Sequence, residues 1–165
     1  MTSAAYRNYR NYRPIDPARA RRIHTLAVPL GLGLLVLGAV LAGVVVYLAL
    51  TWAPKVPLLA MTAGMHGATA LIAMCSGVIT ISLRKAVSTG WLNLGSANAA
   101  RRNLAVLWTL SILMALLGWL GVGAGPSLAH VSLGVPVVVA SMLVPIVLLL
   151  YNGIVTVLVS RLLRT

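Results

Sequence analysis

Residues 58–83 read LLAMTAGMHGATALIAMCSGVITISL, and this stretch decides the fold. It is long enough to cross a bilayer, because about 20 residues at ~1.5 Å each span a hydrocarbon core of roughly 30 Å. On a helix, its polar and small side chains share one face: Thr62, His66, Thr69, Ala73, Ser76, Gly77 and Thr80. Such groups on a spanning helix face protein rather than lipid. The sequence therefore predicts a helix that turns this face inward against other helices.

The composition is that of an integral membrane protein. The chain has 165 residues, of which 60% are hydrophobic and 8% charged, and its mean hydropathy is +0.98. Three further apolar stretches have the length of a spanning helix, at residues 26–52, 103–122 and 131–158. We therefore expect an all-α, polytopic membrane protein folded as a four-transmembrane-helix bundle. The other segments are a basic arm (1–25), a loop (84–102) and a C-terminal end (159–165).

The distribution of basic residues predicts the orientation of the bundle. The arm carries six Arg, the loop four basic residues and the C-terminal end two, whereas the two remaining turns contain only Lys55. Twelve against one is a strong positive-inside signal. We therefore expect a multi-pass protein of the bacterial plasma (inner) membrane, N-in and C-in, with both termini in the cytoplasm.

The shortage of acidic residues excludes several classes of function. Asp16 is the only acid against 13 Lys and Arg, and the formal net charge is +12. Paired carboxylates for acid–base catalysis cannot form, nor can carboxylate cages for Mg²⁺ or Ca²⁺. Because the basic residues are interleaved with apolar spans, anionic lipids are favoured over nucleic acid as partners. We expect no enzymatic activity, no cofactor and no nucleic-acid partner.

His66 is the only acidic or basic residue deep inside a predicted span, which makes it a functional candidate. Three roles stay open: hydrogen bonding to a neighbouring helix, contact with a substrate or proton, and ligation of a metal or haem. The predicted intramembrane polar stripe consists of Thr62, His66, Thr69, Ser76, Thr80 and, from the last span, Asn152.

A metal or haem centre is not expected. Cys75 projects about 180° away from His66 on the same helix, and Met61 and Met65 also point elsewhere, so one ion cannot engage them together. Haem ligation by two histidines needs a second one at matching depth. His24 and His130 lie instead near opposite edges of the predicted spans.

The basic arm contains a three-residue repeat, Tyr-Arg-Asn, that starts at Tyr6. A period of three matches neither a helix nor a strand, and Pro14 discourages both, so we expect an extended cytoplasmic arm and no strands. It is either a solvated tail or a strip that docks on a partner, since Tyr and Arg are favoured at interfaces. The candidate partner contacts are Tyr6, Arg7, Tyr9, Arg10, Tyr12 and Arg13.

Small residues predict two kinds of helix contact. Gly31 and Gly38 share a face of the first span and permit close approach of a helix inside the bundle. Gly64 and Ala68 lie off the inward face of their span and are candidate contacts with other integral membrane subunits. Gly33 and Gly43 are expected to lie off the inward face as well.

The 84–102 loop combines basic residues with an aromatic one. It is either a plain connector or a segment that dips into the membrane interface. Its candidate contacts with lipid headgroups are Arg84, Lys85, Trp91, Arg101 and Arg102.

These observations favour a non-catalytic function. We expect an accessory or assembly subunit of a larger membrane complex, such as a lipid or ABC-type transporter or a respiratory assembly. The alternative is a small self-contained carrier or channel that uses His66 and the Thr/Asn stripe. A haem-binding membrane protein is a third reading.

Overall fold

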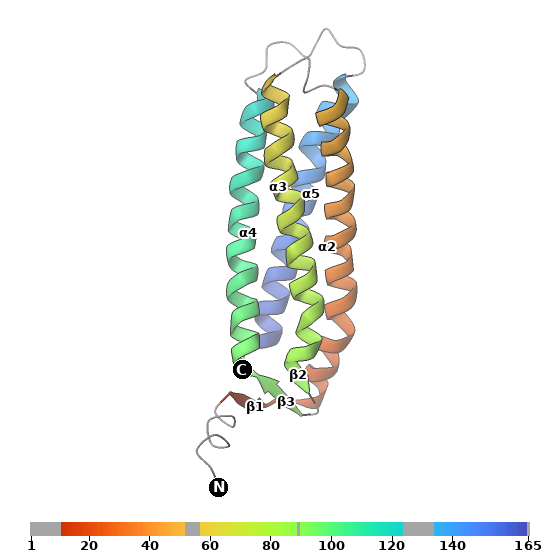
Figure 1. The fold of residues 1–165 in the computed structure, drawn as a ribbon. Coiled ribbons are helices and arrows are strands. Elements are labelled where there is room, and N and C mark those ends of the chain that lie inside the picture. Colours follow the sequence, from red (N-terminus) through yellow and green to blue (C-terminus); the bar gives the residue numbers. More distant parts are fainter. Residues whose placement is uncertain (1–10, 52–56, 89, 124–133, 165) are drawn as a thin grey trace.

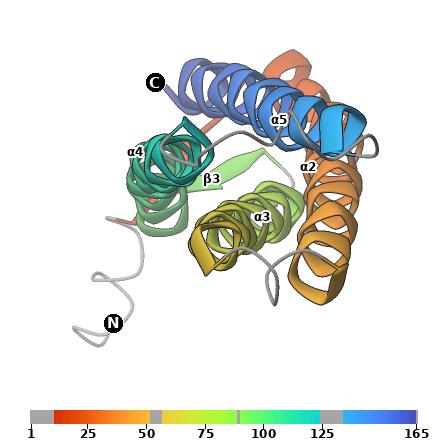
Figure 2. The same cartoon turned by 90° about the horizontal axis from the view of Figure 1, so that it is seen from above.

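Four long helices form an antiparallel bundle (Figure 1). The computed structural model describes residues 11–51, 57–88, 90–123 and 134–164. Each of the four helices is long and apolar enough to cross a membrane. Seen along the bundle axis, the helices follow one another around a ring in chain order (Figure 2). They are α2 (Pro17–Thr51), α3 (Pro57–Ser82), α4 (Leu94–Gly123) and α5 (Gly134–Leu163).

Two helices begin earlier than the hydropathy pattern predicts. α2 begins at Pro17 rather than at residue 26, and the Asp16 carboxylate caps it by accepting the N–H of Ala18 at 3.1 Å. The expected arm is therefore shorter, and its last basic residues are helical. α4 begins at Leu94 rather than at residue 103, and the Asn93 side chain accepts the N–H of Ser96 at 3.1 Å.

The expected loop at 84–102 is largely ordered secondary structure. A 3₁₀ helix, η1 (Leu83–Ala86), follows α3, and the short strands β2 (Val87–Ser88) and β3 (Trp91–Asn93) come next. The strands are antiparallel, and Gly90, just before β3, has a φ of 80°, a conformation that favours glycine.

The N-terminal arm supplies a third strand, which corrects the expectation that the chain has none. β1 (Tyr12–Pro14) pairs antiparallel with β3, in the order β1-β3-β2. Pro14 is tolerated because β1 is an edge strand. The carbonyl of Asn11 also accepts the N–H of Leu94 at 2.8 Å, so the arm satisfies a free donor at the start of α4. We call this end of the bundle the sheet end; in Figure 1 the start of α2 and the end of α5 also lie there.

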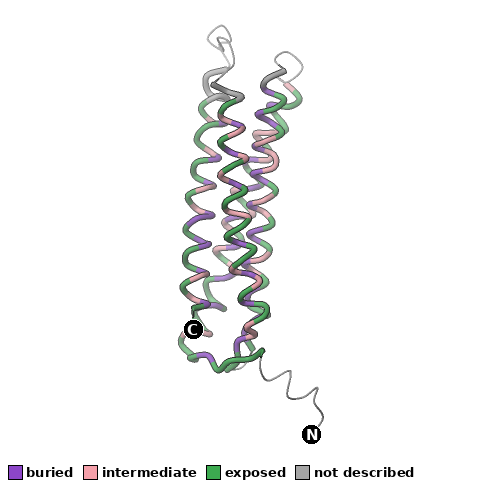
Figure 3. The backbone as a smooth tube through the Cα atoms, turned by 90° about the vertical axis from the view of Figure 1, so that its left-hand side faces the viewer, coloured by how far each residue is buried: buried purple, intermediate pink, exposed green. Residues whose placement is uncertain are grey.

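Buried residues line the axis of the bundle along its described length (Figure 3). At the sheet end Leu92 of β3 is buried under the sheet, where it joins Ile23 and Leu163 in the same apolar cluster. Farther along the axis, four leucines have at most 1% of their surface exposed: Leu34, Leu41, Leu104 and Leu148.

The pair α2 and α3 has the most extensive contact of any two helices, and glycine makes it possible. A Cβ added at Gly31 would lie 2.7 Å from the carbonyl oxygen of Gly77, and one added at Gly77 would lie 2.7 Å from the carbonyl oxygen of Gly31. A Cβ at Gly38 would approach Met74 to 2.7 Å. The small-residue face predicted for the first span is therefore confirmed as the contact with α3.

Gly43 supplies a matched control on the same helix. We predict that Gly31→Ala destabilises the bundle by about 1–3 kcal/mol, because the backbones of α2 and α3 must separate to admit the methyl group. Gly43→Ala should leave stability unchanged or slightly higher, since a Cβ there meets nothing within 4 Å. Unfolding of the two variants in detergent, followed by circular dichroism, measures the difference. Equal midpoints would contradict the close helix crossing.

Candidate functional site

The polar face of α3 is buried along the axis of the bundle, as the sequence predicts. Thr62, His66, Thr69, Ser76 and Thr80 all have 0% of their surface exposed. Polar side chains from the two following helices join them, namely Ser111 of α4 and Ser141, Asn152 and Thr156 of α5. The structure thus brings the six residues of the predicted stripe into the interior.

His66 lies where α3, α4 and α5 meet. Its imidazole packs directly on Gly118 of α4, since a Cβ added there would lie 2.5 Å from both Cε1 and Nδ1 of the ring. The backbone of Ser141 on α5 also lies close to the imidazole. Neither ring nitrogen makes a hydrogen bond of normal geometry with the described part of the chain. His66 therefore fills the space beside a glycine rather than acting through an observed hydrogen bond.

Most hydroxyl groups of α3 donate a hydrogen bond to a carbonyl of the same helix. Thr69 donates to the carbonyl of Met65 at 3.0 Å, and Thr80 donates to that of Ser76 at 2.7 Å. Ser76 bonds in the same way to the carbonyl of Ile72 at 3.0 Å. Such bonds let hydroxyl groups lie inside a helix bundle without another partner.

Thr62 makes the clearest polar contact between helices in this region. Its hydroxyl donates to the carbonyl of Gly118 at 3.2 Å. The same glycine thus receives a hydrogen bond from one turn of α3 and the imidazole of His66 from the next. Gly118 is consequently a residue through which α4 packs closely against α3.

Several buried polar atoms have no hydrogen-bond partner in the described part of the chain. Besides the imidazole nitrogens of His66, they include the hydroxyl oxygens of Ser111 and Thr156, both polar atoms of the Asn152 amide and Nε1 of Trp119. An unmet polar group in an apolar interior costs free energy, so these atoms favour a water or a small polar molecule beside them. These atoms lie at two depths of the bundle, near His66 and near Asn152.

Leucine separates these two depths on α5. The buried positions of this helix between them are, in order, Ser141, Pro145, Leu148 and Asn152. Leu148 is 1% exposed and belongs to the main apolar cluster. Apolar side chains therefore separate the two polar levels of this helix.

The candidate partner contacts have mixed surroundings. Tyr6, Arg7, Tyr9 and Arg10 lie outside the described residues, whereas Tyr12 and Arg13 belong to β1 and pair with β3 of the same chain. Gly64 is exposed, and a Cβ there would meet nothing within 4 Å; Ala68 is half-buried. Gly43 is open in the same way, but Gly33 is not, because Tyr151 of α5 occupies the space beside it.

The candidate headgroup contacts all lie toward the sheet end, but not in one loop. Arg84 and Lys85 are exposed on η1, and Trp91 is exposed on β3. Arg101 and Arg102 were expected to close the loop, but they are helical residues of α4. The early start of α4, with Asn93 as its cap, is the physical reason.

The sequence analysis missed a second group of basic residues. Arg19, Arg22 and Arg161 line one pocket between α2 and α5. The signal for the first two was present, since an Asp-Pro pair at 16–17 is typical of a helix start and places Arg19 and Arg22 on one helical face.

The soft ligands of α3 do not converge. Cys75 is exposed, whereas His66 is buried at the axis. His24 is exposed at the sheet end, and His130 lies outside the described residues. Among the residues that the structure describes, no group of three or more His, Cys, Asp or Glu could hold a metal ion.

Comparison with known proteins gives no family for this chain. No protein-family model, curated protein sequence or solved structure matches it.

A double-mutant cycle tests the contact between His66 and Gly118. Gly118→Ala alone should destabilise the bundle by about 1–3 kcal/mol, because its methyl group has no room beside the imidazole. In a His66→Ala background the same change should cost much less, which gives a coupling of roughly 0.5–3 kcal/mol. Reversible unfolding in detergent measures all four proteins. Strict additivity would show that the two residues do not touch.

Proposed function

We propose that this chain is a non-catalytic accessory or assembly subunit of a larger complex in the bacterial inner membrane. The proposal has three parts: the bundle axis serves to hold the helices together, the sheet end faces the cytoplasm, and another membrane subunit packs against the outer face of α3. A lipid or ABC-type transporter and a respiratory assembly remain the two kinds of complex that we expect.

The proposal is supported mainly by the way side chains fill the axis of the bundle. Thr69, Ser76 and Thr80 each bond to a carbonyl of their own helix, so these hydroxyls are not left to line a path. Leu148 lies between the two polar levels of α5, and Leu34, Leu41 and Leu104 are equally buried. A core built in this way supports a structural role along the described length of the axis, rather than conduction.

The orientation rests on charge. The basic residues of the described arm, of η1 and of the C-terminal end of α5 lie at the sheet end. Cytoplasmic segments of membrane proteins are enriched in Lys and Arg. This favours an N-in and C-in topology with the sheet in the cytoplasm.

The partner surface rests on the outer side of α3. Gly64 is exposed and Ala60, one turn earlier, is exposed as well. Small residues four apart allow a second helix to approach closely, and in lipid such packing is a main source of association between helices. An integral membrane subunit with its own close-packing face is the partner that this chemistry favours.

A second candidate function is a small carrier or channel for a polar solute. It is favoured by the unpartnered atoms of His66 and Asn152 inside the bundle, which are suited to a small molecule that donates and accepts hydrogen bonds. Under this alternative the buried leucines would have to move for the solute to pass.

A pair of variants separates the two functions. Gly64→Leu should shift the protein from a larger assembly to the mass of the isolated subunit in native electrophoresis, because a large side chain blocks close approach. The matched control Val106→Leu, at an exposed position on α4, should leave the assembly intact. If the wild-type protein is instead a monomer that transports a solute into liposomes, and His66→Gln abolishes that flux, the carrier function replaces the proposed one.

A further inference from the structure

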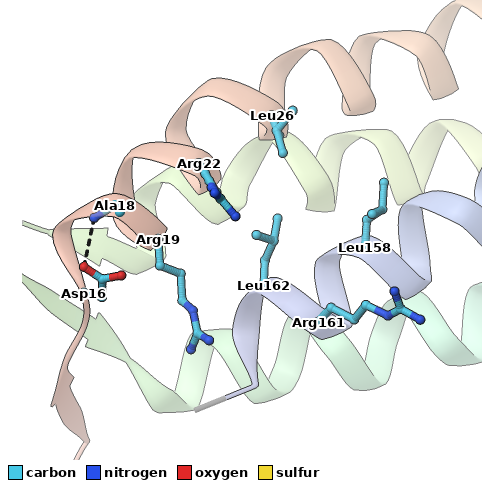
Figure 4. A pocket seen from close by; sticks show the side chains of 8 residues that line it. All are labelled: Asp16, Ala18, Arg19, Arg22, Leu26, Leu158, Arg161 and Leu162. Carbon is cyan, nitrogen blue, oxygen red and sulfur yellow. Dashed lines mark hydrogen bonds between the residues drawn. The ribbon is translucent and has the colours of Figure 1, made fainter.

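A basic pocket lies at the sheet end between the first turns of α2 and the last turns of α5. Its volume is about 490 Å³. Arg19 and Arg22 of α2 and Arg161 of α5 line its polar part. Figure 4 shows Arg22 reaching from α2 into the space between the two helices. The pocket therefore gathers charge from segments that are far apart in the sequence.

The pocket has an excess of positive charge. Its lining contains three Arg and a single acid, Asp16, which gives a formal charge of +2. Asp16 accepts the N–H of Ala18 and so caps the start of α2. Arg19 donates to the carbonyl of Arg164 at 2.6 Å, which joins the two helices. Arg22 and Arg161 are exposed, and the charge of this pocket is complementary to an anion.

The apolar part of the pocket faces the middle of the bundle. Leu26 follows Arg22 by one turn of α2, and Leu158 precedes Arg161 by about one turn of α5, so both leucines are farther from the sheet end than the arginines (Figure 4). A groove of about 520 Å³ between α4 and α5 shares Leu158 and Arg161 with the pocket and has Trp108 in its wall. A charged site thus continues into an apolar surface.

We infer that this pocket binds one anionic diacyl phospholipid. Its phosphate group lies between Arg22 and Arg161, since guanidinium groups form paired hydrogen bonds with phosphate oxygens. One acyl chain lies on Leu26 and Leu158, and the second follows the groove between α4 and α5. Basic pockets between helices at a cytoplasmic membrane surface suit such headgroups. The inference is independent of the proposed assembly role, because a solitary bundle would bind the same lipid.

Binding in the pocket makes a different prediction from diffuse attraction to the exposed arginines at the same end. In native mass spectrometry of the full chain with dioleoyl-phosphatidylglycerol, the double variant Arg22→Gln/Arg161→Gln should bind about thirtyfold more weakly, at roughly fivefold per arginine near an anionic headgroup. The control Arg21→Gln/Arg164→Gln removes the same charge at the same end, from two exposed arginines that do not line the pocket, and should bind as the wild type does. Equal losses in both variants would overturn the pocket in favour of diffuse attraction.

Two further binding experiments identify the source of the phosphate group. Dioleoyl-phosphatidylcholine should bind far more weakly than the anionic lipid, and inorganic phosphate at millimolar concentration should not displace the lipid. Displacement by inorganic phosphate would mean that the pocket is a free-anion site, and equal binding of both lipids would mean that charge does not select the ligand. Thermal unfolding confirms that each variant is folded, and Arg19 is left unchanged because it holds the end of α5.

Discussion

Hydrocarbon cannot hydrogen-bond to a polar side chain, and the arrangement of the helices around α3 follows from this constraint. α3 carries five fully buried polar residues, and their burial requires neighbours on both sides. Glycine provides the close fit: Gly31 admits α3 beside α2, and Gly118 admits His66 beside α4. Once these two contacts are made, α5 closes the ring, and its own polar residues face the same axis.

At the sheet end, outside the apolar part of the bundle, backbone groups also need hydrogen-bond partners. Without the arm, the hairpin between α3 and α4 would present a free strand edge and an unpaired N–H at Leu94. The arm covers both, because β1 pairs with β3 and the carbonyl of Asn11 accepts the N–H of Leu94. Leu92, held by this pairing, closes the apolar cluster at that end. The arm thus belongs to the fold as well as carrying positive charge.

The parts of this fold that depend on periodicity and hydropathy could be predicted from the sequence. The inward face of α3 and the groove at Gly31 are of this kind, since 3.6-residue spacing places their residues together. The start of α2 could not be placed by hydropathy, because Arg19, Arg21 and Arg22 continue the helix beyond the apolar segment. The pairing of β1 with β3 joins residues about 80 positions apart, which no local pattern reveals. The pocket at Arg22 and Arg161 was missed for the same reason.

The rotation of α3 about its own axis is the central claim, and the single cysteine of the chain reports it directly. Cys75 lies about 180° around the helix from His66 and is exposed on the outside of the bundle. A spin label on this native thiol, in lipid nanodiscs, should be strongly relaxed by oxygen and hardly at all by a water-soluble nickel complex. Low accessibility to both reagents, as for a label packed inside the protein, would mean that the polar face of α3 is not turned inward.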